Sequence, residues 1–202
     1  LGDEAITLSD KTISAIDLKT LDGNTTGTID ASSVLTITGS ITDINSAYAS
    51  NEITGLGNEA ITLSNSTISA SALNTLDTAT TGEVNTSVIT TITGSITDIN
   101  SAYASNGITG LGDEAITLSD STISASALNT LDTATTGEVN TSVITTIAGA
   151  IADINTAYAS TSITGLGDEA IILTDTSIDA AYLNTLDAYT TGTINAASIT
   201  TL

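Results

Sequence analysis

The chain contains no histidine, cysteine, proline, methionine, phenylalanine or tryptophan among its 202 residues. Without Cys and His it cannot build a Cys/His zinc site, a cysteine nucleophile or a Ser-His-Asp triad. It also cannot form a disulfide, so cysteine usage does not indicate a redox compartment. The lack of proline suits a chain in which every segment uses its backbone N–H groups to bond neighbouring strands. These absences favour a non-enzymatic, structural protein.

Basic residues are nearly absent as well. Lys11 and Lys19 stand against 23 acidic residues, which gives a net charge of −21. Because contacts to phosphate need Lys and Arg, nucleic acid and anionic membranes are excluded as partners. No apolar run approaches the roughly 20 residues of a membrane span, so we expect no membrane insertion. The chain begins within a repeat and without Met, so we expect it to be a piece of a longer protein.

What the chain does contain is a tandem repeat of 55 residues. "LGDEAITLSD" at residues 1–10 returns with small changes at residues 56, 111 and 166, so the repeats are 1–55, 56–110, 111–165 and a partial 166–202. "LNTLDTATTG" occurs unchanged at residues 73–82 and 128–137. A fixed period indicates a repeat architecture. We therefore predict a single repeat domain over residues 1–202.

A shorter spacing inside the repeat sets the predicted fold. Pairs of aliphatic residues three apart recur at steps of 16, 19 and 20 residues, as in Leu18/Leu21, Val34/Ile37 and Ile53/Leu56. Short segments such as "AITLS" (115–119), "GEVNT" (82–86) and "SITDI" (95–99) lie between them and resemble alternating strands. We expect a mainly β parallel β-solenoid (β-helix) of about eleven coils, three per repeat. Serine before the aliphatic pairs predicts a short helical turn at one corner.

Two other architectures fit the same repeat. A leucine-rich-repeat-like solenoid would place a strand and a short helix in every coil. A duplicated two-domain globule would carry the repeat without stacking it. The core composition favours stacked coils over the globule, because nearly all of the large apolar side chains are Ile, Leu and Val.

The repeated carboxylates raise the question of a calcium site. The acidic residues fall into series with the 55-residue period, such as Asp22, Asp77, Asp132 and Asp187. Stacked in columns, members of one series would lie about 14 Å apart, at about 4.8 Å per coil, which is too far for one ion to bridge. We therefore expect most of them to be structural. The best metal candidates come from the "LGDE" motif: Asp113, Glu114, Asp168 and Glu169.

Threonine and tyrosine offer weaker functional signals. Arrays of Thr on a flat β-face are typical of ice binding, but pairs such as Thr80/Thr81, Thr90/Thr91 and Thr135/Thr136 recur only once per repeat. Tyr48, Tyr103 and Tyr158 occur once per repeat in "AYAS", where a packed corner residue is the expected role. No pair of carboxylates is singled out for acid–base catalysis, so we predict that the chain is not an enzyme.

The stretches "TTGEVNTSVITTITGSITDINSAYAS" and "GLGDEAITLSDSTISASALNTLD" resemble the low-complexity repeats of very large surface or secreted proteins of marine cyanobacteria. In that family such repeats often adjoin hemolysin-type calcium-binding segments. The resemblance implies an extracellular, spacer-like repeat of β-solenoid type. The hemolysin nonapeptide is absent here, so no calcium ligands are carried over from it.

These observations together predict a stalk, spacer or surface-coat segment of a larger extracellular or cell-surface protein. The alternative is a calcium-binding or ice-binding β-solenoid module. We expect no cofactor, with calcium as the one candidate. Exposed coil ends predict head-to-tail self-association as the mode of partnering.

Overall fold

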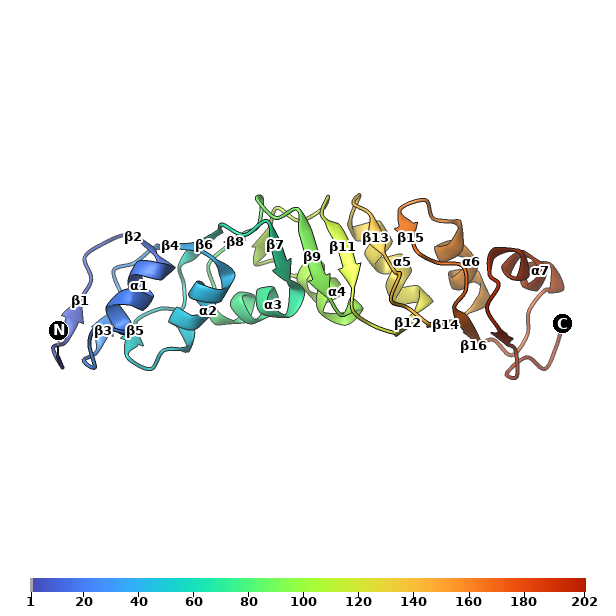
Figure 1. The fold of residues 1–202 in the computed structure, drawn as a ribbon, viewed down its shortest axis with the longest axis horizontal. Helices are drawn as coiled ribbons and strands as arrows, with labels where there is room; N and C mark the ends of the chain where they lie inside the picture. Colours follow the sequence, from blue (N-terminus) through green and yellow to red (C-terminus); the bar gives the residue numbers. More distant parts are fainter. Residues whose placement is uncertain (1) are drawn as a thin grey trace. The chain divides into compact units, whose positions relative to one another are not determined.

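The fold combines helices and parallel strands in regular alternation. A computed structural model describes residues 2–202, of which 32% are helical and 25% lie in strands. The chain divides into two compact units, one made of residues 2–90 and 101–111 and the other of residues 91–100 and 112–202. Figure 1 shows the helices of each unit lying side by side, with the strands following the same succession.

The first unit contains two parallel sheets and three complete helices. One sheet has the order β1-β3-β5 and the other β10-β8-β6-β4-β2. The helices α1 and α2 contact each other, as do α2 and α3. The bounds are β1 (Ile6–Thr7), β2 (Thr12–Ser14), α1 (Ala15–Asp22), β3 (Ile29–Asp30), β4 (Thr36–Gly39), α2 (Ile41–Ala49), β5 (Ile53–Thr54), β6 (Ala60–Leu63), β7 (Thr67–Ser69), α3 (Ala70–Ala79), β8 (Val84–Asn85) and β10 (Ile108–Thr109).

The second unit repeats this arrangement. Strand β11 pairs with β9 and β13, β13 pairs with β15, and a further sheet has the order β12-β14-β16-β17. Helix α6 contacts α5 and α7. The bounds are β9 (Thr91–Gly94), β11 (Ala115–Leu118), β12 (Thr122–Ser124), α5 (Ala125–Ala134), β13 (Val139–Asn140), β14 (Thr146–Gly149), α6 (Ile151–Ala159), β15 (Ile163–Thr164), β16 (Ala170–Leu173), α7 (Ala180–Tyr189) and β17 (Ile194–Asn195). Helix α4 (Ile96–Ala104) has residues in both units.

Paired strands place side chains of the same kind next to each other. Ile13 pairs with Ile37, and Ile37 with Ile61, so these two steps along the sheet are 24 residues each. Ile37 and Ile61 are buried, and the flanking Thr36, Thr38, Ala60 and Thr62 lie on the other face. Each fully buried Ile or Leu contributes roughly 1.5–3 kcal/mol. A parallel sheet needs a crossover between its strands, and here the short helix provides it.

Each helix buries one narrow stripe of aliphatic side chains. In α2 the stripe is Ile41, Ile44 and Ala47, and in α3 it is Ala70, Leu73 and Leu76. The residues follow at intervals of three, which places them on one face of a helix. Ser40 caps α2 by accepting a hydrogen bond from the backbone N–H of Asp43 at 3.2 Å. The prediction of a short helical turn after serine holds only in part. Helices do follow Ser69 and Ser124, but they extend for two to three turns and neither serine makes a side-chain cap hydrogen bond. The pair Ile89/Ile92, which follows Ser87, leads into strand β9 instead of a helix.

The predicted fold class is wrong in its main feature. The chain is not a mainly β solenoid of eleven coils, because each 55-residue repeat holds two helices that begin 26 or 29 residues apart. The aliphatic pairs are not equivalent: Leu18/Leu21 lies in α1, whereas Ile37 and Ile53 lie in strands. The architecture is closer to the alternative in which every coil contains both strand and helix. From here on, one coil means one helix together with the two or three strands that lie between it and the next helix.

Some individual strand predictions are correct and one is wrong. "AITLS" forms β11 as predicted, with Ile116 and Leu118 buried and Thr117 exposed. "GEVNT" contains β8. "SITDI" was expected to be a strand, but Ile96 is the first residue of α4. Ile96 and Ile99 are three apart and Ala102 continues the spacing, so the pattern belongs to a helix.

Candidate functional site

A buried carboxylate recurs once in each repeat from the second onward. Glu59 has no exposed surface, and Glu114 and Glu169 are 1% exposed. The Oε2 atom of Glu59 accepts hydrogen bonds from the Tyr48 hydroxyl at 2.7 Å and from the backbone N–H groups of Gly57 at 2.8 Å and Asn58 at 3.1 Å. Because a buried charge must be hydrogen-bonded to be tolerated, these donors hold the carboxylate in place.

The last repeat builds the same site. The Oε2 atom of Glu169 accepts from the Tyr158 hydroxyl at 2.7 Å and from the Gly167 N–H at 2.9 Å. In both sites the second oxygen, Oε1, is buried without a hydrogen-bond partner. The distances agree between the two sites, so the same hydrogen-bonded arrangement recurs with the repeat.

The repeated stretch "LNTLDTATTG" closes this site from the next coil. Its two leucines, Leu73 and Leu76, are fully buried in α3. The hydroxyl of Thr80 donates to the carbonyl oxygen of Glu59 at 2.9 Å and accepts from the N–H of Gly82 at 2.9 Å. We call Glu59, Tyr48, Thr80 and Gly82 the glutamate cluster, a name that also covers Glu169, Tyr158, Thr190 and Gly192. In that second set the Thr190 hydroxyl donates to the carbonyl oxygen of Gly167, at 3.3 Å.

Glycine is required at the end of the stretch. A Cβ atom on Gly82 would lie 2.2 Å from the carbonyl oxygen of Glu59, and one on Gly192 would lie 2.0 Å from that of Glu169. The backbones of two successive coils therefore touch here, and no side chain fits between them. This close approach explains why "TTG" occurs in every repeat.

The cluster also changes the acidity of its tyrosines. Burial raises the pKa of the Tyr48 hydroxyl well above its ordinary value of 10.0, and the hydrogen bond to Glu59 raises it further. Burial and then Glu169 raise the pKa of Tyr158 in the same direction. Both hydroxyls remain protonated donors to the carboxylate through the physiological range.

The four predicted metal ligands fall in two environments. Glu114 and Glu169 are buried within the repeat, while Asp113 and Asp168 are exposed in the preceding turn. Glu169 is already bonded to a tyrosine and a backbone amide. Within residues 2–202 no three acidic side chains come together as a metal site would require. Calcium binding at these four residues stays a prediction.

The other acidic series connect one coil to the next. Three aspartates at the ends of helices accept a hydrogen bond from a serine 28 residues later, at 2.8–3.0 Å: Ser50 to Asp22, Ser105 to Asp77 and Ser160 to Asp132. A second series accepts from the first N–H of a helix in the preceding coil, at 2.7–2.8 Å: Ile41 to Asn65, Ile96 to Asp120 and Ile151 to Asp175. Most periodic polar residues are thus used in contacts between coils.

Asparagine side chains join the helices directly. The Nδ2 groups of Asn45, Asn100 and Asn155 donate to backbone carbonyls 27 residues later, at 3.0–3.2 Å. The accepting residues are Ala72, Ala127 and Tyr182. The helix faces are therefore joined by polar contacts as well as by the aliphatic stripe.

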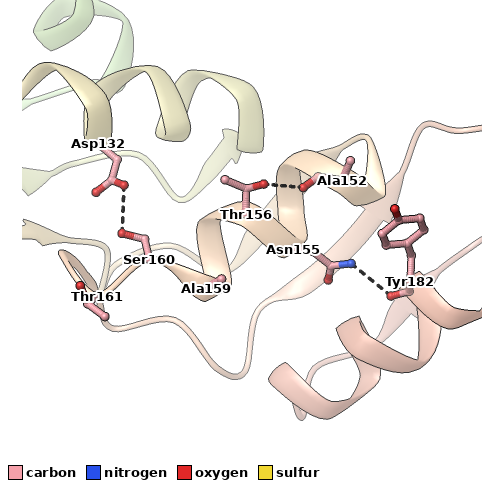
Figure 2. A pocket seen from close by; sticks show the side chains of 8 residues that line it. All are labelled: Asp132, Ala152, Asn155, Thr156, Ala159, Ser160, Thr161 and Tyr182. Atoms are coloured by element: carbon pink, nitrogen blue, oxygen red, sulfur yellow. Dashed lines mark hydrogen bonds between the residues drawn. The ribbon is translucent and has the colours of Figure 1, made fainter.

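A surface depression lies in the second unit, against α6. It has a volume of about 650 Å³ and is lined by Asp132, Ala152, Asn155, Thr156, Ala159, Ser160, Thr161 and Tyr182. Figure 2 shows Tyr182 and Asp132 toward its two ends, with Asn155 and Thr156 between them. We call this depression the tyrosine hollow. Small polar side chains and one aromatic ring could hold a polar organic molecule.

The sequence offered a signal for each site that the prediction missed. Glu59, Tyr48 and Thr80 share the 55-residue period, which marks them as one unit, but the 24-residue step between paired strands that brings them together was not predicted. Tyr182 and Tyr189 replace alanine at the matching positions of the second and third repeats. That substitution was the only sequence sign of the tyrosine hollow.

No family model, curated protein or solved structure matches this chain. Among residues 2–202, no helix is both long and apolar enough to cross a membrane.

Proposed function

We propose that the chain is a non-enzymatic structural segment, a stalk, spacer or surface coat, of a larger extracellular protein. The observation that carries the proposal is the use of the periodic polar residues. The buried glutamates, the aspartates at helix ends and the helix asparagines contact the chain's own coils. Hydrogen bonds between neighbouring coils are what a repeat needs to stack regularly. Because these side chains already bond the chain itself, few periodic polar side chains are left to form a recurring ligand site.

Two further properties support a spacer. The second and third repeats differ at few positions, so an added repeat lengthens the chain and presents nearly the same surface residues again. The charge of −21 keeps a long repeat soluble and discourages pairing of sheet edges. The extracellular location rests on the resemblance to cyanobacterial surface repeats.

Other copies of the same repeat are the proposed partners. Leu183 and Ile199 are partly exposed, whereas Leu128 and Ile144, one repeat earlier, are 0% and 4% exposed. The interior residues are covered by the following coil. A further coil of the same sequence would cover the exposed pair in the same way.

The proposal is tested by changing the number of repeats. One variant lacks residues 56–110 and a second carries that segment twice, so both keep the register. We expect the far-UV circular dichroism per residue to stay the same, and the radius of gyration from X-ray scattering to change by similar steps. A variant that loses its helix and strand signal would contradict the proposal, because a spacer must tolerate a change of length.

A further inference from the structure

The fourth repeat carries two tyrosines that the interior repeats lack. Tyr182 and Tyr189 on α7 are 54% and 42% exposed. The second repeat has Ala72 and Ala79 at these positions, and the third has Ala127 and Ala134. Because the two tyrosines are seven residues apart, they lie on one face of the helix, about 10.5 Å apart along its axis. Large exposed rings at such positions indicate a binding surface more than a core.

The Tyr189 ring packs against α6, and Tyr182 lines the tyrosine hollow beside that helix. The Tyr189 ring stacks on Tyr158, with centroids 5.9 Å apart and an interplanar angle of 12°. Tyr158 is itself fixed by the bond from its hydroxyl to the buried Glu169. Tyr182 lines the tyrosine hollow (Figure 2), and its carbonyl accepts from Asn155 at 3.2 Å. A ring fixed in advance, as that of Tyr189 is, loses little entropy when a ligand binds.

The polar groups of the hollow keep capacity for a ligand. The carboxylate of Asp132 accepts from Ser160 and Ser162 and still has lone pairs to offer. Thr156 donates to the carbonyl of Ala152 and can still accept. Within residues 2–202, the hydroxyls of Thr161 and Tyr182 make no hydrogen bond to the chain. Donors and acceptors therefore stand beside an aromatic face.

Charge narrows the chemistry of the ligand. The stretch from residue 112 to residue 202 holds no Lys or Arg, so a sulfated, phosphorylated or uronate polymer would find no counter-charge there. Asp132 would repel such a polymer. A neutral ligand with hydroxyl groups and apolar C–H faces fits both the polar groups and the rings, since a tyrosine presents an apolar face and a polar tip.

We propose that the tyrosine hollow, with the ring of Tyr189, binds a neutral glycan, with pyranose rings stacked on Tyr182 and Tyr189. Because the two tyrosines lie on one face of α7, a single extended glycan chain can contact both rings. Polar groups of the hollow, Asp132, Thr156 and Thr161 among them, would bond the sugar hydroxyls. This adds an anchoring site to a segment whose proposed role is otherwise structural.

The test is titration of the whole chain with cellohexaose, laminarin and dextran, with alginate as an anionic control. Because the chain has no Trp, tyrosine fluorescence reports the site, and calorimetry gives the affinity. We expect saturable binding of at least one neutral glycan and none of alginate. The double variant Tyr182→Ala/Tyr189→Ala should bind about tenfold more weakly or not at all.

The chain supplies its own control for folding. Helices α3 and α5 form with alanine at both positions, so the double variant should keep its circular dichroism spectrum. Tyr182→Phe should retain most of the affinity, because the ring face remains. Failure of all three neutral glycans to bind, or equal binding by the double variant, would overturn the proposal. Self-association that depends on the two tyrosines, with no glycan binding, would assign the patch to a protein contact instead.

Discussion

Helices α2 and α6 have nearly the same sequence but begin differently. Helix α2 starts after Ser40, whose hydroxyl caps the Asp43 N–H. Helix α6 starts after Ala150, whose methyl group cannot accept a hydrogen bond, yet this helix has the same length of nine residues. In both, the first N–H is bonded by a side chain of the next coil: Asn65 for Ile41 at 2.8 Å and Asp175 for Ile151 at 2.8 Å.

The difference shows which contact the repeat depends on. The local cap can be lost without loss of the helix, whereas the cap from the neighbouring coil is present in both cases. The buried stripes are also the same: Ile41, Ile44 and Ala47 in one helix, and Ile151, Ile154 and Ala157 in the other. Contacts between coils should therefore outweigh contacts within a coil, and the following predictions rank the two kinds.

The largest effect is expected where two coils touch. Gly82→Ala would place a Cβ atom 2.2 Å from the carbonyl oxygen of Glu59, so the two coils would have to separate. We expect a loss of about 3 kcal/mol or more in the free energy of unfolding, measured by urea denaturation. Gly23→Ala is the matched control, because its Cβ would meet nothing closer than 3.5 Å and should change stability little. Equal effects of the two variants would contradict the account.

The second-largest loss of stability is expected from a change in the glutamate cluster. Tyr48→Phe removes one of the three donors to the buried Oε2 of Glu59 and should lower stability by about 2 kcal/mol, as expected for a hydrogen bond to a charged group. Tyr158→Phe should act similarly, through Glu169. A change below a few tenths of a kcal/mol would mean that water replaces the hydroxyl.

The same tyrosines give an alkaline pH dependence. Their pKa values are raised in the folded state, so their contribution to stability is complete below the ordinary value of 10.0 and is lost as the pH rises beyond it. Absorbance titration of tyrosinate should show that Tyr48 and Tyr158 ionise above the ordinary pKa of tyrosine. Tyr48→Phe should remove one of the late ionisations, and its persistence would contradict the assignment.

The two ways of capping a helix can be compared in α6. Asp175→Ala removes the acceptor of the Ile151 N–H and should cost about 1–2 kcal/mol. Ala150→Ser adds the cap that α2 already has and should gain about 1 kcal/mol or less. Thermal melts of both variants measure the comparison. A gain from the serine that exceeds the loss from Asp175→Ala would reverse the ranking of the two contacts.

The smallest effect is electrostatic. The hydroxyl of Ser40, and then Lys19, lower the pKa of Asp43 below its ordinary value of 3.8. The stabilisation is therefore present above about pH 4 and is lost as the pH falls through the lower, folded-state pKa. Ser40→Ala should raise this pKa in an NMR titration more than Lys19→Ala does. The opposite order would assign the shift to the ion pair, whose Nζ–Oδ1 distance is 3.0 Å.

The sequence predicted the repeat and part of the local structure, for reasons that particular residues show. "AITLS" alternates apolar and polar side chains over a full strand, so its period of two was unambiguous. "SITDI" is too short to separate a strand from a helix, and its Ser, Thr and Asp are weak helix formers. Packing of Ile96 and Ile99 against the core decides for the helix, and packing was not visible in a five-residue window.

The glutamate cluster shows where prediction from sequence ended. Tyr48 and Glu59 are 11 residues apart, and Thr80 is 21 residues beyond Glu59. Joining them requires the 24-residue step between paired strands, whereas the aliphatic pairs suggested steps of 16 to 20. The buried position of the glutamate was equally hidden, because an acidic residue beside Gly and Asp is expected in a solvated turn.

The central claim is that the periodic polar residues stabilise the coils without a bound ion. Its most direct test is a thermal melt followed by far-UV circular dichroism, run in millimolar Ca²⁺ and again in EDTA. We predict the same midpoint in both, from a spectrum with helix and strand contributions. A midpoint many degrees higher in Ca²⁺ would show that the folded state binds the ion, and the acidic residues, Asp113, Glu114, Asp168 and Glu169 first among them, would then have to be reassigned as ligands.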